Sequence, residues 1–171
     1  MILKKTLLLL LATVMIIASV CSCGDNSSDV TYREEGLEMT LPKSMRRSLS
    51  STYEFYFSTP DSVLTAKKLD GAFMESMEMS ASTTAEEYAD AYIDANNFDK
   101  SRINYTHDAE RGAYRMRYNN SENGEELLHF ISILGEPGAI WFVEIVCEND
   151  KASIYEATFE TWESSIRTYK E

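Results

Sequence analysis

The chain has 171 residues, with 16 Lys and Arg against 28 Asp and Glu, which gives a formal net charge of −12. This length suits one domain and is too short for two ordinary enzyme domains. The acidity argues against nucleic-acid binding, because phosphate contacts require a basic patch. It also argues against electrostatic docking on an anionic lipid surface.

Residues 1–22 have the pattern of a secretory signal peptide. Lys4 and Lys5 form a short basic start, and an uncharged run follows over residues 6–20. As a helix this run would extend about 22 Å, which is short of the roughly 30 Å hydrocarbon core of a bilayer. The sequence therefore predicts a cleaved leader and not a permanent span. Loss of its two lysines takes the net charge from −12 to −14.

The end of the leader, Val20-Cys21-Ser22-Cys23, resembles the lipobox of bacterial lipoproteins, whose cysteine receives a diacylglycerol before cleavage. Val20 and Ser22 are suitably aliphatic and small for lipidation at Cys23. Cys21 is the alternative, although it would place the branched Val20 where the family has Gly, Ala or Ser. The resemblance implies a lipid anchor on the extracytoplasmic face of a cell membrane. An ordinary signal peptide that happens to end in cysteines is the simpler alternative.

The chain beyond the leader divides into a tether and one domain. Residues 23–30 are predicted to be the lipidated cysteine and a flexible, small and polar tether, and residues 31–171 a single domain. Cys147 is then the one thiol left after the anchor, so we expect no intrachain disulfide. It lies in an apolar, strand-like run, which predicts a buried and inert thiol.

The first half of the domain has three strand patterns and one helix pattern. Apolar and polar residues alternate over residues 37–41, and further strands are expected at 53–57 and 62–69. Thr83 to Glu86 has the spacing of a capping box, and apolar residues then follow at helical spacing. This pattern predicts a helix over residues 84–96.

The second half predicts four strands and a final helix. Short strands are expected at 104–108 and 114–118, followed by a turn at 119–124. Residues 126–134 and 139–147 form a predicted hairpin whose arms are almost entirely apolar, so it should be central and covered on both faces. Asn149-Asp150 can cap the last helix, whose apolar stripe comprises Tyr155, Phe159, Trp162, Ile166 and Tyr169.

The predicted order, β-β-β-α-β-β-β-β-α, indicates an α+β domain with an antiparallel sheet packed against helices. Four segments carry a resemblance to the Mog1p/PsbP-like domains of small bacterial lipoproteins: Leu37–Pro42, Glu86–Tyr88, Trp141–Phe142 and Phe159–Trp162. The resemblance covers about residues 31–171 and implies an α/β/α sandwich. Members of this fold include a binder of a small GTPase and an extrinsic subunit of a photosynthetic complex, so the resemblance implies a non-enzymatic binding module.

Two other functions have candidate residues. His107-Asp108 or His129 could serve a small hydrolase or a zinc site, but neighbouring residues on a strand point to opposite faces, and the two histidines are far apart in sequence. Met74, Met77 and Met79 could carry copper through their thioethers, although methionines at this spacing more simply fill a core.

The leading hypothesis is therefore a lipid-anchored, non-catalytic module that uses no cofactor and binds a protein partner in the cell envelope. The acidic residues occur as scattered pairs, as on a solvated surface, and an acidic face that recruits a cationic partner is the alternative. Tyrosines on a sheet face that no helix covers could form the partner-binding surface, because Tyr and Trp favour interfaces.

Overall fold

The computed structural model describes residues 29–170, so the leader, Cys21, Cys23 and most of the tether lie outside the described residues. A seven-stranded antiparallel sheet forms the centre. In spatial order its strands are β3 (Arg46–Arg47), β4 (Phe55–Ser58), β5 (Ser62–Asp70), β9 (Ala139–Glu148), β8 (Glu125–Glu136), β7 (Ala113–Glu122) and β6 (Thr106–Asp108). A smaller sheet has the order β1 (Asp29–Glu34), β2 (Leu37–Pro42) and β10 (Arg167–Thr168).

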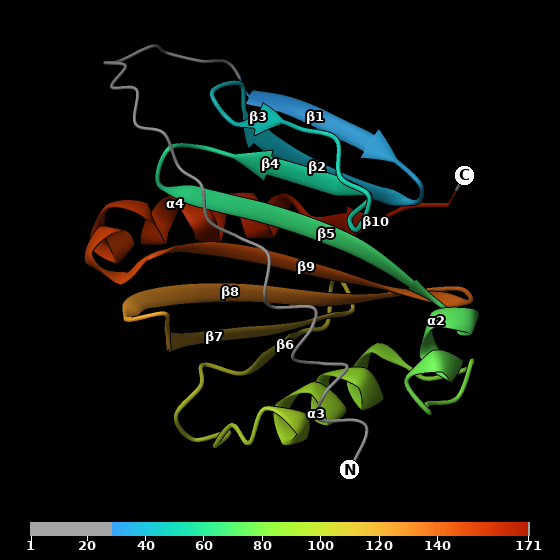
Figure 1. The fold of residues 1–171 in the computed structure, drawn as a ribbon. Helices are drawn as coiled ribbons and strands as arrows, with labels where there is room; N and C mark the ends of the chain where they lie inside the picture. Colours follow the sequence, from blue (N-terminus) through green and yellow to red (C-terminus); the bar gives the residue numbers. More distant parts are fainter. Residues whose placement is uncertain (1–28, 171) are drawn as a thin grey trace.

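Helices lie on both faces of the large sheet, as the sequence predicted. On one face α4 (Ala152–Ser165) packs together with β2 over β4, β5, β9 and β8, and Phe159, Trp162 and Trp141 are buried there. On the other face α3 (Ala85–Ala95) and α2 (Gly71–Ser76) contribute to a second core with Ile131 and Ile133. Figure 1 shows α4 behind β5 and β9, whereas α3 lies in front at the β6–β7 end.

The β8–β9 hairpin is central, and β8 is covered on both faces. Every residue from Leu127 to Leu134 is buried, which confirms the prediction for this arm. The hairpin turns at Pro137-Gly138, with Glu136 opposite Ala139. The preceding turn is shorter than predicted, because β7 extends to Glu122 and only Asn123-Gly124 connects it to β8. Both turn residues have positive φ, 54° and 87°, as a two-residue hairpin turn requires.

The cap of α3 lies one residue beyond its predicted place. Thr84 is the N-cap and Glu87 the N3 residue, and each side chain bonds the backbone N–H of the other. The sequence prediction of Thr83 and Glu86 was wrong by one position. Both pairs have the required Thr-x-x-Glu spacing, so spacing alone could not separate them.

The last helix also differs from its prediction at both ends. A short 3-10 turn, η1 (Asn149–Lys151), precedes α4, and the N-cap is Lys151, with no side-chain hydrogen bond. At the other end the backbone becomes extended at Ile166. Tyr169 therefore lies beyond the helix, where the Arg33 guanidinium stands 4.0 Å from its ring centre.

Four elements have no counterpart in the sequence prediction, namely β1, β3, α2 and β10. Two of them, β3 and β10, have only two residues each. β1 begins at Asp29, so the last two residues of the predicted tether belong to a strand. Among residues 29–170, no helix has both the length and the apolar composition needed to cross a membrane.

Candidate functional site

The most unusual polar contact on the α3 side of the sheet joins His129 of β8 to Glu144 of β9. Their Nδ1 and Oε1 atoms are 2.9 Å apart. The hairpin register places Ile131 opposite Glu144 and Val146 opposite His129, so the pair is diagonal on one face. Because an ionised carboxylate can only accept, Nδ1 is the donor, and Nε2 of a neutral ring is left as an acceptor. That Nε2 is buried without a hydrogen-bond partner among the described residues.

Tyrosines surround this pair. The ring of Tyr118 stacks on His129 with centroids 4.7 Å apart, and its hydroxyl lies 3.0 Å from that of Tyr92. Burial, Tyr118 and then Glu144 raise the pKa of Tyr92 well above its usual value. The pKa of Tyr53 is also raised, first by burial and then by Glu144 and Tyr56. Glu144 is therefore close enough to act electrostatically on tyrosines from two different parts of the chain.

The sheet around Glu144 is only partly covered. Tyr56, Thr65 and Glu144 lie opposite one another across β4, β5 and β9, and strand alternation puts Val63 and Val146 on the same face. Tyr56, Val63 and Val146 belong to neither hydrophobic core and are half-buried. We call this region the open face, defined by Tyr53, Tyr56, Val63, Glu144 and Val146, whereas Thr65, between Tyr56 and Glu144 in the register, is buried. Of the helices within residues 29–170, none lies in front of β5 in Figure 1.

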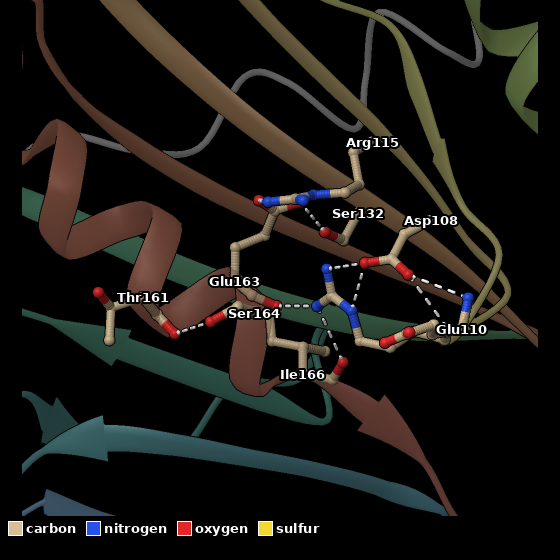
Figure 2. A network of polar contacts seen from close by, with 9 residues as sticks. Asp108, Glu110, Arg115, Ser132, Thr161, Glu163, Ser164 and Ile166 are labelled. Carbon is tan, nitrogen blue, oxygen red and sulfur yellow. Dashed lines mark hydrogen bonds and ion pairs between the residues drawn. The ribbon is translucent and has the colours of Figure 1, made fainter.

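A second polar network, on the opposite face, is fully engaged within the protein. Figure 2 shows Glu163 of α4 beside Arg115 of β7 and Ser132 of β8. Arg115 forms a bidentate ion pair with the Glu163 carboxylate, and the Ser132 hydroxyl donates to Oε1 at 2.6 Å. Glu163 is only 4% exposed, and a carboxylate so buried requires a cation. The network therefore fixes α4 on the sheet.

Arg111 extends this network to the end of α4. Its guanidinium donates to the backbone oxygens of Glu163 at 2.6 Å and Ile166 at 3.5 Å, and it pairs with Asp108 at 2.7 Å. A cation suits this position, because the last carbonyls of a helix lack intrahelical partners. The hydrogen bond from Arg111 is the largest cause that lowers the pKa of Asp108. These contacts hold the helix terminus in place.

The structure separates His107 from His129. His107 is exposed on β6 and stacks on Tyr114, whereas Asp108 is engaged with Arg111. His107 is opposite Tyr114 and His129 is opposite Tyr118, four residues away along β7, which is about 13 Å. The two histidines therefore do not share a site.

The methionines and Cys147 belong to the hydrophobic packing. Met74 is buried in the core beneath α3, and Met77 and Met79 pack against the same core while remaining half-buried. Cys147 is buried on the α4 side, as the sequence predicted, and burial is the main cause that raises its pKa to about 11. Within residues 29–170, no group of three or more His, Cys, Asp or Glu has an arrangement that could hold a metal ion.

Glu144 was missed by the sequence analysis, which treated its strand as almost entirely apolar. The signal was present, since a charged residue in such a strand needs a partner or an open face. The two-residue turn at Pro137-Gly138 fixes the hairpin register, and this register brings Glu144 next to His129. A lipidation site at Cys23 or Cys21 stays a prediction, because both residues lie outside the described residues.

No family model and no curated protein sequence matches the chain. A crystal structure from Bacteroides thetaiotaomicron superposes with a TM-score of 0.52 at 12% identity, over 86% of this chain and 50% of that one. This chain thus spans half the length of that protein. The Ran-binding protein Mog1p of Saccharomyces cerevisiae gives 0.51 at 4% identity, over 84% and 96%.

Cyanobacterial PsbP from Synechocystis is also similar, with a TM-score of 0.43 at 14% identity over 90% of this chain and 99% of that one. At these identities a likeness concerns the fold alone. The superpositions on the Bacteroides protein and on Mog1p, together with the antiparallel sheet between α3 and α4, show that this chain has an α+β, Mog1p-like fold.

Proposed function

We propose that this chain is a lipid-anchored binding module on the extracytoplasmic side of a membrane, and that it binds a protein partner of the cell envelope without catalysing a reaction. The observation that carries this proposal is the open face. It presents a half-buried tyrosine and a partly exposed carboxylate on the sheet, with a second half-buried tyrosine, Tyr53, in the loop before β4. Tyrosine is enriched at protein interfaces because its ring buries a large area and its hydroxyl can bond.

The expected anchor would hold the domain near the membrane. Five residues, 24–28, separate Cys23 from the start of β1 at Asp29. Six residue steps span at most about 20 Å when fully extended. The domain would therefore remain close to the bilayer surface, and its partner would be a protein of the same membrane or one that reaches it.

The fold is compatible with protein binding. Mog1p is a Ran-binding protein, so a domain of this architecture can recognise another protein. This similarity concerns the fold only, and no binding residue is transferred from Mog1p. Support for the proposal comes from this chain's own open face.

A small hydrolase is the second candidate, and the His129–Glu144 contact favours it, because a carboxylate that orients a histidine is common in catalytic sites. The argument against a hydrolase is that a substrate has no access to His129. The free nitrogen of His129 is buried, and Tyr118 stacks on the ring. A general base must come within hydrogen-bond reach of the proton that it removes.

Site-directed photocrosslinking tests the binding proposal in cells that express the full chain. A photoreactive residue is placed at Ser58, beside Tyr56 on the same face of β4, and in a control at Glu160, exposed on α4 across the sheet. A discrete protein adduct from position 58, absent from position 160 and competed by unlabelled protein, is the expected result. Equal adducts from both positions, or none from position 58, would contradict the use of the open face.

A further inference from the structure

We infer that the open face recognises a cationic side chain, lysine or arginine, of its protein partner, with the Glu144 carboxylate as counter-ion and the Tyr53 and Tyr56 rings beside it. This inference rests on the proposed function and specifies the chemistry of the partner. Three observations support it: the cationic partners of other carboxylates in this protein, the exposure of the Glu144 side chain, and the groups around Glu144 that attract cations.

Several partly buried carboxylates elsewhere in the protein have a lysine or arginine partner, whereas Asp61 accepts from the Tyr155 hydroxyl. Glu163 has Arg115, Glu136 has Lys68 at 2.6 Å, and Glu38, with a side chain 12% exposed, has both Arg33 and Arg167. Glu144 is comparably buried, with 18% of its side chain exposed, yet its partner within residues 29–170 is a histidine. A carboxylate withdrawn from water gains most from a cation, since its attraction is less screened there.

The lysine nearest to Glu144 by register is engaged elsewhere. Lys67 lies opposite Phe142, diagonal to Glu144 across β5 and β9. Its ammonium stands 4.2 Å from the centre of the Phe73 ring. The position beside Glu144 is thus left for a group from outside the described residues, and 18% exposure leaves an approach to the carboxylate.

The aromatic groups around Glu144 attract cations. Tyr53 and Tyr56 have ring centroids 6.5 Å apart and supply aromatic faces that attract cations. A carboxylate beside two aromatic faces favours the approach of a basic segment and disfavours an acidic one.

The test uses the full chain in a zwitterionic detergent and two capped peptide probes, tri-arginine and tri-citrulline. Citrulline has nearly the shape of arginine but carries no charge. Calorimetric titration should show that tri-arginine binds and that tri-citrulline does not. Glu144→Gln, which can still accept from His129, should weaken tri-arginine binding roughly tenfold, because a charge-assisted contact becomes a neutral one. Glu148→Gln removes the same charge from the same strand face and serves as the matched control.

Glu144→Gln could disturb folding, so Tyr53→Ala provides a second variant that leaves the carboxylate and His129 in place. It should also weaken tri-arginine binding, through the loss of one aromatic face. Equal affinity for both probes, or equal losses in Glu144→Gln and Glu148→Gln, would overturn the inference. If that occurs while position 58 still crosslinks a partner, only the cationic chemistry is wrong. If position 58 captures no partner, the proposed function itself fails.

Discussion

Gly36 lies directly against Glu136: a Cβ atom at Gly36 would stand 2.6 Å from Oε2 of Glu136. Glu136 is held in that position, because the Trp141 indole donates to Oε2 at 3.1 Å and Lys68 pairs with Oε1. Lys68 also donates to the backbone oxygen of Glu35 at 2.9 Å. The Glu136 carboxylate thus joins the β1–β2 turn to the β8–β9 hairpin. In this way it also joins the small sheet to the large one.

Replacement of Gly36 by alanine should destabilise the fold by roughly 1–3 kcal/mol, because the backbone has a φ of 89° and the new methyl group meets Glu136. Gly138→Ala is the matched control, since its φ is 83° and nothing lies within 4 Å of its Cβ position. Denaturant unfolding of both variants measures the difference. Equal losses would show that Glu136 moves aside without cost.

Truncation of Trp162 to alanine should cost roughly 3–5 kcal/mol, as for other buried aromatic residues. Its side chain is 6% exposed, and its ring centre is 5.2 Å from that of Phe159 in the core beneath α4. Since small domains have about 5–15 kcal/mol of stability, the variant should be marginal. A thermal melt checks this, and a shift of only a few degrees would show that the helix does not depend on this contact.

Cys147 should resist alkylation in the folded protein at pH 8 and react quickly once the chain is unfolded. Burial restricts access, and a pKa raised to about 11 keeps the thiol protonated, whereas the thiolate is the reactive form. The folded pKa is above the ordinary value of 9.0, so this group's contribution to stability should be present below about pH 9 and be lost between about pH 9 and 11. Labelling kinetics with iodoacetamide, with and without denaturant, provide the measurement. Fast labelling of the native protein would contradict burial of the thiol.

The double variant His107→Ala, His129→Gln should keep the cellular role of the protein. The glutamine amide can still donate to Glu144, and the two histidines do not share a site. A complementation assay in cells is the readout, accompanied by circular dichroism and membrane fractionation. Loss of function in a variant that folds and attaches normally would revive the hydrolase alternative.

Cys23→Ala should release the protein from membranes or leave it unprocessed, whereas Cys21→Ala should change little. The reason is the lipobox-like pattern before Cys23, in which Ser22 provides the small residue that cleavage requires. Detergent phase partitioning of both variants is the test. Equal loss of partitioning in the Cys21 variant would transfer the predicted anchor to Cys21.

The sequence predicted the elements whose signals are local. The alternation in β2 and the apolar run of β8 are properties of consecutive residues, and the structure has strands at these places. The two-residue strands β3 and β10 are too short to have such a pattern, and each is defined by its pairing with another strand, β4 and β2 respectively. Similarly, α2 has six residues, too few for a helical repeat to be recognised.

The sequence could predict that an open face with tyrosines exists, but not which residues form it. Aromatic composition indicated that some tyrosines would lie on an uncovered face, and Tyr53 and Tyr56 do so. Tyr53 lies in the loop before β4, and no local pattern brings such a residue towards Glu144 of β9. Contacts of this kind depend on strand order in the finished sheet, which sequence periodicity does not contain.

The strand pairings also differ in how far apart along the chain their partners lie. Strands β7, β8 and β9 follow one another through two-residue turns, so each pairing closes only a short loop. The small sheet instead needs β2 to meet β10, as in the contact of Arg167 with Glu38 across 129 residues. Loop closure of this length is slow and entropically costly. We therefore expect the β7–β9 meander to form early in folding, and the sheet that begins beside the tether to be completed last.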